Sequence, residues 1–339
     1  MASGKPDSRM HNGLIILDSH AFESIYGQEH LEMISRRVRL LAPPMTRTEA
    51  LRHPDLLAQV DVIFSGWGAP TMDASFLAVA KKLKAVFYGA GTIRYFTSDE
   101  FWARDIAVSS AYAMNAVPVA EYTLGTILLS LKNYWFHAFE IKRARRLTER
   151  VRCAGGYGSK VGLISLGMIG RLVRERLRTF DVEVLAYDPY VDPVEAAKLG
   201  VELVSLDELF SECDVVSLHT PWLKETEGMI EGRHFERMKP RASFINTARG
   251  AIVRESEMTE VLQRRTDLTA LLDVTWPDPP AEDSLLWTLP NVIITPHIAG
   301  SRDRECRRMG RLMIDEFDRW NRGEPLQWAI SAEKSLVLA

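Results

Sequence analysis

Three loops in the second half of the chain carry side chains that are typical of acid–base chemistry and anion binding. Arg249 lies in FINTARGAIV, Asp278 in LLDVTWPDPP and His297 in IITPHIAGS. Each loop follows an apolar, strand-like run, so each should lie at the carboxyl edge of a parallel sheet, where ligands bind. An imidazole titrates near neutral pH, and a guanidinium matches the planar geometry of a carboxylate. These residue types predict a site that binds an acid and moves a proton.

The elements that must position these loops alternate regularly between short apolar runs and helical patterns. This alternation is typical of a parallel sheet with helical connections. Six such strands predict one doubly wound nucleotide-binding domain. Their expected ranges are Val161–Ser165, Glu183–Tyr187, Val215–His219, Ala242–Asn246, Ala270–Asp273 and Val292–Thr295.

The rest of the chain predicts a second α/β domain that is discontinuous in sequence. Strands are expected at Leu14–Leu17, Val62–Phe64 and Ala85–Tyr88, and one long helix from Val117 to about Arg152. The apolar first part of that helix should be buried, and its basic end should be a solvated helix terminus. A helical stretch from Ser301 should pack back on the first third. We therefore expect a discontinuous α/β domain in residues 1–116 and 300–339, and a Rossmann domain in residues 117–299.

Composition limits the classes of function. Hydrophobic residues make up 46% of the 339 and charged residues 26%, the balance of a folded globular protein. A net charge of −3 gives no general attraction to nucleic acid, and no apolar run is long enough to span a membrane. The first dozen residues lack the apolar block of a signal peptide, so we expect a loose tail and a cytoplasmic location. Three scattered cysteines predict neither a disulfide framework nor a metal site.

A glycine turn, SLGMIG at residues 165–170, follows the first strand of the predicted nucleotide domain. Gly167 would let the backbone approach a pyrophosphate, and Gly170 would let the following helix pack closely. Ser165 replaces the first glycine of the pattern and fits comfortably only with a negative φ. Asp188 ends the next strand, where a carboxylate accepts hydrogen bonds from ribose hydroxyls and repels a 2′-phosphate. The turn and the aspartate together favour NAD over NADP.

Eight segments follow one another over nearly the whole chain: YGAGTIR, NAVPVAEYTL, SLGMIG, AYDPY, VSLHTP, NTARG, DVTWPDPP and TPHIAG. Their order is more specific than any one of them. With these segments the chain resembles the D-isomer-specific 2-hydroxyacid dehydrogenase family, which includes phosphoglycerate dehydrogenases and glyoxylate/hydroxypyruvate reductases. The resemblance implies that the discontinuous domain is a flavodoxin-like substrate domain. The resemblance implies an NAD-dependent oxidoreductase that transfers a hydride between NAD(H) and C2 of a small 2-oxo or 2-hydroxy acid of the D configuration, in a cleft between the domains. It also implies a homodimer, with the apolar part of the long helix at the interface.

The resemblance assigns catalytic roles to the three loops. Arg249 matches the family's catalytic arginine, His297 its acid/base histidine and Asp278 its acidic residue, which is usually a glutamate. Hydride addition to a carbonyl carbon builds negative charge on the oxygen, so His297 would donate a proton and Arg249 would bind the substrate carboxylate. Asp278 would favour the protonated imidazole. Glu282 or Asp283 could fill this last role instead.

The resemblance also implies binding residues in both domains. The backbone N–H groups of Ala90 and Gly91 would bind the substrate carboxylate, together with Arg249 and His297. Trp67 could contact the substrate side chain or pack in the core. The cofactor would be bound by Gly167, Met168, Ile169, Asp188, Thr220, Pro221, Thr247, Ala248, Arg249, Asp273, His297 and Ala299.

Two other functions on the same scaffold are alternatives. An NAD(H)-sensing, corepressor-like interaction protein would keep Arg249 and His297, although the chain shows no evident partner-binding extension. A formate dehydrogenase would have an amide at the position of Asp278, and the carboxylate there argues against it. Turnover of 2-oxo acids with NADH would separate an enzyme from a sensor.

Overall fold

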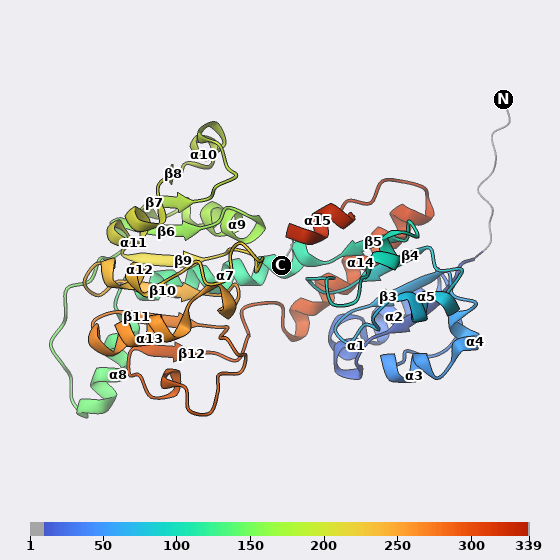
Figure 1. The fold of residues 1–339 in the computed structure, drawn as a ribbon, viewed down its shortest axis with the longest axis horizontal. Helices are drawn as coiled ribbons and strands as arrows, with labels where there is room; N and C mark the ends of the chain where they lie inside the picture. Colours follow the sequence, from blue (N-terminus) through green and yellow to red (C-terminus); the bar gives the residue numbers. More distant parts are fainter. Residues whose placement is uncertain (1–9, 338–339) are drawn as a thin grey trace. The chain divides into compact units, whose positions relative to one another are not determined.

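The computed structural model describes residues 10–337, which pack as two compact units (Figure 1). One unit extends to Asn115 and resumes at Ser301, and the other comprises Ala116–Gly300. Most of the N-terminal tail considered above lies outside the described residues. In the described part of the chain, no helix has both the length and the apolar character needed to cross a membrane.

Within residues 10–337, the first unit contains a parallel five-stranded sheet in the order β2-β1-β3-β4-β5. This is the doubly wound order of flavodoxin-like folds. The sequence pattern misses β2, which has only two residues, and β5, which ends in the polar pair Ser109 and Ser110. The strands are β1 (Asn12–Ile16), β2 (Arg39–Leu40), β3 (Val62–Ser65), β4 (Ala85–Tyr88) and β5 (Ala107–Ser110).

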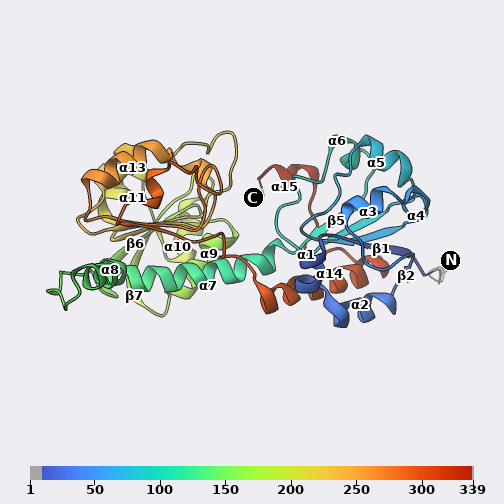
Figure 2. The same cartoon turned by 90° about the horizontal axis from the view of Figure 1, so that it is seen from below.

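Helices cover both faces of this first sheet (Figure 2). One face packs against α1, α2 and α14, and the other against α5 and α6. The C-terminal helix α14 contacts α1 and β4, so the chain does return to its first third, as its pattern predicts. The helices are α1 (Ser19–Ile25), α2 (Gly27–Ser35), α3 (Arg47–Leu51), α4 (Pro54–Leu57), α5 (Ala74–Val79), α6 (Asp99–Trp102), η3 (Asp303–Glu305), α14 (Cys306–Asn321) and α15 (Ala332–Val337).

The second unit contains a parallel seven-stranded sheet in the order β12-β11-β10-β9-β6-β7-β8. The strand order reverses beside β6, as in a Rossmann sheet. The predicted fold class, two doubly wound parallel sheets, is therefore confirmed, with the short β8 as an additional strand. The strands are β6 (Tyr157–Ile164), β7 (Asp181–Tyr187), β8 (Glu202–Leu203), β9 (Val215–Leu218), β10 (Ser243–Asn246), β11 (Thr269–Leu272) and β12 (Val292–Ile294).

Two helical layers bury the second sheet. The part of α7 that belongs to this unit packs with α9 on one face, and α11, α12 and α13 cover the other. Buried aliphatic side chains from both strands and helices fill each layer. The helices are α7 (Tyr112–Ser130), α8 (Tyr134–Ala144), α9 (Met168–Leu177), α10 (Pro193–Leu199), α11 (Leu206–Glu212), α12 (Gly232–Arg237), η1 (Gly250–Ile252), α13 (Glu255–Arg264) and η2 (Leu285–Trp287).

The expectation of one helix from Val117 to about Arg152 is wrong. The helical segment begins earlier, breaks after Ser130 and ends at Ala144. Asn133 adopts a left-handed φ of 51°, and its side-chain amide donates a hydrogen bond to the carbonyl of Arg152 at 2.9 Å. A residue in this conformation interrupts a right-handed helix, and Asn is one of the few that adopt it readily. The apolar pattern continues through the break, so periodicity alone does not reveal it.

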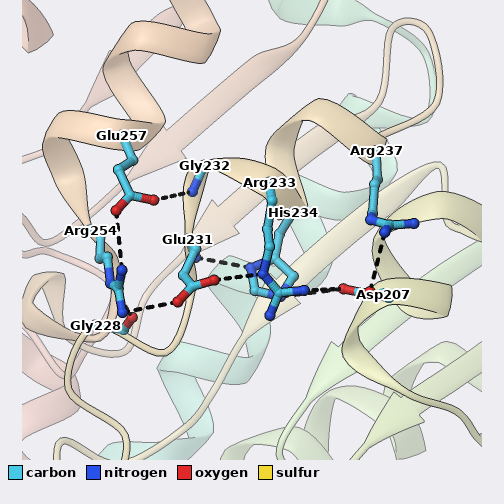
Figure 3. A network of polar contacts seen from close by, with 9 residues as sticks. All are labelled: Asp207, Gly228, Glu231, Gly232, Arg233, His234, Arg237, Arg254 and Glu257. Carbon is cyan, nitrogen blue, oxygen red and sulfur yellow. Dashed lines mark hydrogen bonds and ion pairs between the residues drawn. The ribbon is translucent and has the colours of Figure 1, made fainter.

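A network of charged side chains joins α11, α12 and α13 on the outer face of the second unit (Figure 3). Arg254 donates to the carbonyl of Gly228 at 3.0 Å and pairs with Glu231 at 2.9 Å. The segment from Gly228 to Ile230 in turn hydrogen-bonds to the backbone of Ala251 and Ile252. The pairs are largely exposed and individually weak. Their effect is to brace the backbone immediately after Arg249.

Candidate active site

The loops predicted to carry chemistry meet at one edge of the second sheet. β6, β9, β10, β11 and β12 are parallel, so their carboxyl ends lie on the same side. The residues that follow these ends include the glycine turn, Thr220, Arg249, Asp278 and His297. The turn follows β6, which is where the strand order reverses and where ligands bind in such sheets.

The glycine turn has the close packing that its pattern predicts. α9 begins at Met168, with Gly167 as its N-cap residue, so its unpaired N–H groups open toward the turn. A Cβ at Gly170 would lie 2.1 Å from the carbonyl oxygen of Ser165, so only glycine fits there without a backbone shift. A Cβ at Gly167 would meet no atom closer than 3.9 Å, and the backbone there is accessible.

Ser165 does not have the negative φ that the sequence analysis expects of a serine at this position. Its φ is +77°. The residue is therefore held in the left-handed region that glycine would occupy without strain. Its Oγ lies 3.5 Å from the Asp188 carboxylate, and the next N–H, that of Leu166, donates to the same carboxylate at 2.7 Å. Asp188 thus fixes the turn as well as ending the neighbouring strand.

Buried polar atoms without partners lie at the end of β9. Within the described residues, neither ring nitrogen of His219 has a hydrogen-bond partner, and Thr220 Oγ1 has none. Burial lowers the pKa of His219 to about 3, so its ring is neutral. Buried polar atoms are normally paired. Together with the α9 N-terminus and the accessible backbone at Gly167, these atoms fit a polar ligand such as a dinucleotide. Both residues belong to the motif VSLHTP, but the resemblance assigns a role in cofactor binding to Thr220 and not to His219.

Asp278 and His297 come from different loops and lie side by side. Nδ1 of His297 is 3.3 Å from Oδ2 of Asp278, within hydrogen-bonding distance. The side chain of His297 is 53% exposed and that of Asp278 is 45% exposed, so a small molecule can reach both from this unit's surface. Glu282 and Asp283 are the alternatives to Asp278 as the acidic partner of His297. Within the described residues, Asp278 is the one of the three that lies at hydrogen-bonding distance from the imidazole.

Arg249 follows β10 and is within the electrostatic influence of the same acid. Burial lowers the pKa of its guanidinium and the charge of Asp278 opposes this shift, so the two groups interact electrostatically. The guanidinium retains its charge in a protein. Close packing brings the two loops together, since a Cβ at Gly250 would lie 2.0 Å from the backbone of Thr275. The Asp278 carboxylate therefore lies within hydrogen-bonding distance of an imidazole and interacts with a permanent cation.

A residue that sequence reasoning missed supports the Asp278 loop. Glu255, at the start of α13, accepts a hydrogen bond from the N–H of Trp276 at 3.2 Å. Burial raises the pKa of Glu255, against the effect of its hydrogen bonds to Trp276 and Ser284. Nothing local in the sequence marks Glu255 for this role, because its partner is in another loop. It holds the backbone two residues before Asp278.

The remaining predicted residues of this unit also lie along the carboxyl edge. Thr247 and Ala248 are buried after β10, and Thr123 Oγ1 of α7 is 3.3 Å from Thr247 Oγ1. Pro221 follows Thr220, and Met168 and Ile169 form the first turn of α9. Asp273 and Ala299 are hydrogen-bonded to each other at 2.8 Å. Within residues 10–337, no group of three or more His, Cys, Asp or Glu side chains is placed to hold a metal ion.

The predicted substrate residues of the first unit follow its strands β3 and β4. Ala90 is fully buried and Gly91 half-buried, and the hydroxyl of Ser110 lies within hydrogen-bonding distance of both of their carbonyls, with one proton to donate. The loop is thereby fixed through its carbonyl side. Trp67 is 38% exposed, and its carbonyl accepts from the N–H of Asp18 at 2.9 Å. Its exposure does not suit the core-packing alternative.

Comparison with known proteins identifies the family of this chain. Residues 125–299 match the family described as D-isomer specific 2-hydroxyacid dehydrogenase, NAD binding domain. The D-3-phosphoglycerate dehydrogenase of Mycobacterium bovis is 35% identical over 244 residues, which cover 71% of this chain and 46% of that protein. The chain thus spans about half the length of the curated phosphoglycerate dehydrogenases it matches.

Solved structures share the fold at lower identity. A phosphoglycerate oxidoreductase from Rhizobium etli aligns with a TM-score of 0.79 and 20% identity, over 96% of this chain and 99% of that one. The NAD-complexed form of a D-isomer specific 2-hydroxyacid dehydrogenase from Lactobacillus delbrueckii aligns with a TM-score of 0.78 and 20% identity, over 94% and 100%. Because the family match covers more than half of the residues of this chain, the chain belongs to the D-isomer specific 2-hydroxyacid dehydrogenases.

Proposed function

We propose that the chain is an NAD-dependent oxidoreductase that transfers a hydride between NAD(H) and C2 of a small 2-oxo or 2-hydroxy acid of the D configuration. The observation that carries the proposal is the arrangement at the carboxyl edge of the second sheet. A carboxylate there lies 3.3 Å from an imidazole and interacts electrostatically with a guanidinium. Family membership supports the same reaction class.

The side chains of His297, Arg249 and Asp278 have different roles in the proposed carbonyl reduction. Bound NADH would supply the hydride for the new C–H bond at C2. As charge develops on the carbonyl oxygen, protonated His297 donates a proton to it and becomes neutral. Arg249 binds the substrate carboxylate and stabilises the developing charge. Asp278 favours the protonated imidazole. In the oxidative direction His297 accepts the hydroxyl proton.

The proposed cofactor contacts follow the carboxyl edge of the sheet. The backbone of Gly167, Met168 and Ile169 binds the pyrophosphate at the start of α9. Asp188 retains acceptor capacity for the ribose hydroxyls besides the N–H groups of Leu166 and Tyr190 that it already binds. Its charge disfavours a 2′-phosphate, so we propose NAD over NADP. The other proposed contacts are Thr220, Pro221, Thr247, Ala248, Arg249, Asp273, His297 and Ala299.

The proposed substrate contacts in the first unit are made by backbone N–H groups and by one aromatic side chain. The N–H groups of Ala90 and Gly91 bind the substrate carboxylate, supported by the way Ser110 fixes their carbonyls. Trp67 contacts the substrate side chain, and its partial exposure supports this role. Exchanging Trp67 for Ala should change the ratio of kcat/KM between small and bulky 2-oxo acids.

We also propose that the chain forms a homodimer through α7 and α8. α8 buries none of its residues within the described chain, and it exposes Tyr134 and Phe139 by 49% and 48%. Leu129 of α7 is 40% exposed. Replacing Phe139 by Asp should shift the mass measured by light scattering toward that of a monomer. The sequence expectation of a cytoplasmic location is kept as part of the proposal, and cell fractionation tests it.

A panel of 2-oxo acids with NADH tests the proposed function. Oxidation of NADH with at least one acid is expected, and Arg249→Lys should raise KM for that acid because Lys lacks the bidentate fork. Tight NADH binding without turnover of any acid would favour the corepressor-like alternative instead. The relatives described above are named as dehydrogenases or an oxidoreductase, and nothing found supports that alternative.

A further inference from the structure

The carboxylate of Asp273 is buried and almost fully occupied by hydrogen bonds from one short segment. It is 3% exposed. Oδ1 accepts from Thr295 Oγ1 at 2.6 Å and from the N–H of Ile298 at 2.8 Å, and Oδ2 accepts from the N–H of Ala299 at 2.8 Å. A carboxylate has about four acceptor positions, so at most about one is left. Asp273 therefore holds the turn that contains His297.

His297 itself has a conformation that needs such support. Its φ is +53°, in the left-handed region, where a residue with a side chain is strained. Its N–H donates to the carbonyl of Asp273 at 3.1 Å and to that of Thr295 at 2.9 Å. Strained residues persist where surrounding contacts determine their conformation. Here those contacts come from Thr295, which precedes the turn, and from Asp273, which follows the neighbouring strand β11.

The hydroxyl of Thr295 connects this turn to helix α7. Thr295 has a single hydroxyl proton, which it donates to the acceptor-only carboxylate of Asp273. Its oxygen must then accept from the hydroxyl of Tyr122, 3.1 Å away in α7. Burial raises the pKa of Tyr122, so its phenol keeps its proton and can donate at neutral pH. The order of donors in this chain is therefore Tyr122, then Thr295, then Asp273.

We propose that Thr295 is a positioning residue: with Tyr122 behind it, it orients the Asp273 carboxylate that clamps His297 in its left-handed turn. The proposal rests on the proposed function, because it assigns Thr295 a role in presenting the acid/base imidazole to the substrate. No contact of Thr295 with the substrate is required. Its effect passes through the backbone of Ile298 and Ala299.

The consequence for turnover follows from geometry. A misplacement of a reacting group by 1 Å can lower the rate by about 100-fold. Thr295→Val keeps the side-chain volume but removes the donor to Asp273 and leaves the Tyr122 hydroxyl without its acceptor. We expect kcat for 2-oxo acid reduction to fall by about 10- to 100-fold with a smaller change in KM for NADH. Tyr122→Phe should lower kcat in the same direction and by less.

Matched variants separate positioning from general loss of stability. Thr295→Ser keeps the hydroxyl and should restore most of the wild-type kcat. Thr259→Val removes a buried threonine hydroxyl from α13, where it donates to the carbonyl of Ser256 in its own helix, and should leave kcat unchanged. All rates are compared per folded molecule, after measurement of the folded fraction by circular dichroism.

A second measurement does not depend on turnover. Hydrogen exchange of the backbone amides should become at least about tenfold faster at Ile298 and Ala299 in Thr295→Val, but not in Thr259→Val. Wild-type kcat and wild-type exchange in Thr295→Val would overturn the proposal, and so would an equal loss of kcat in Thr295→Ser. If the wild type turns over no 2-oxo acid while Thr295→Val still loses protection at these two amides, the proposed function fails and the clamp is supported.

Discussion

Nδ1 of His297 lies 3.3 Å from Oδ2 of Asp278, although the two residues belong to loops that follow different strands. Asp278 follows β11 and His297 follows β12, and these strands are parallel neighbours. The loops therefore leave the sheet side by side. An aspartate at this place is one methylene shorter than the glutamate usual in the family, and the geometry shows that it still reaches the imidazole.

Removing the charge of Asp278 should shift the pH profile of reduction. The carboxylate stabilises the protonated imidazole that donates the proton. In Asp278→Asn the proton is lost more readily, so the pH at which reduction falls to half should decrease. Both side chains are about half exposed, so the effect should be smaller than that of removing one partner of a buried pair. The measurement is kcat/KM for a turned-over 2-oxo acid between pH 5 and 9 (roughly the range in which imidazole titrates).

Glu282→Gln is the matched control for this variant. Glu282 is exposed in the same loop, and the structure gives it no hydrogen bond to His297 within the described residues. Its profile should overlay that of the wild type. An unchanged profile in Asp278→Asn would show that the two groups are not coupled, and a shift confined to Glu282→Gln would assign the role to Glu282.

The two glycines of the turn should respond differently to alanine. A Cβ at Gly170 would lie 2.1 Å from a backbone oxygen, so Gly170→Ala should lower the free energy of unfolding by about 1–3 kcal/mol. Gly167→Ala meets no atom within 3.9 Å and should change stability by less than about 0.5 kcal/mol, yet weaken NADH binding. Urea unfolding and NADH titration measure the two effects. Equal stability losses would contradict the close-packing argument.

Ser165 predicts a stabilising substitution. Its φ of +77° is available to glycine without strain, and an L-residue in the left-handed region costs about 1 kcal/mol or more. Ser165→Gly should therefore raise the free energy of unfolding by about 1 kcal/mol, since the contact of Ser165 Oγ with Asp188 is long at 3.5 Å. The same change at Ser211, inside α11, should lower stability by about 0.5 kcal/mol. A loss at Ser165 as well would mean that its hydroxyl outweighs the strain.

The sequence is sufficient to predict most strands of the two sheets and the loops at their edges. Runs such as Ala85–Tyr88 are short and buried on both faces, so their apolar pattern marks them directly. In a parallel sheet the carboxyl ends share one side, so Arg249, Asp278 and His297 can be placed near one another without coordinates. β2 and β8 have only two residues each, which is too short for a periodic signal.

Contacts between side chains far apart in sequence are not predictable in this way. The hydrogen bond from Tyr122 to Thr295 joins residues 173 positions apart, and it depends on how α7 lies against the sheet. The left-handed φ of His297 and of Ser165 likewise arises from tertiary contacts, against the preference of both residue types. The break at Asn133 depends on a bond to Arg152, which the helical pattern does not encode.

His219 makes the stability of the cofactor-free protein depend on pH. Burial lowers its pKa in the folded state to about 3, whereas an unfolded histidine titrates near 6.5. Below pH 6.5 the unfolded chain binds a proton that the folded chain does not, so stability falls as the pH falls. From pH 7 to 5 this group alone should cost about 2 kcal/mol, and His219→Gln, which cannot titrate, should lose about 2 kcal/mol less over that range. The exposed His20, changed to Gln, should leave the wild-type pH dependence intact. Urea unfolding at the two pH values measures the difference, and equal losses in wild type and His219→Gln would show that the ring is protonated or paired in the folded state.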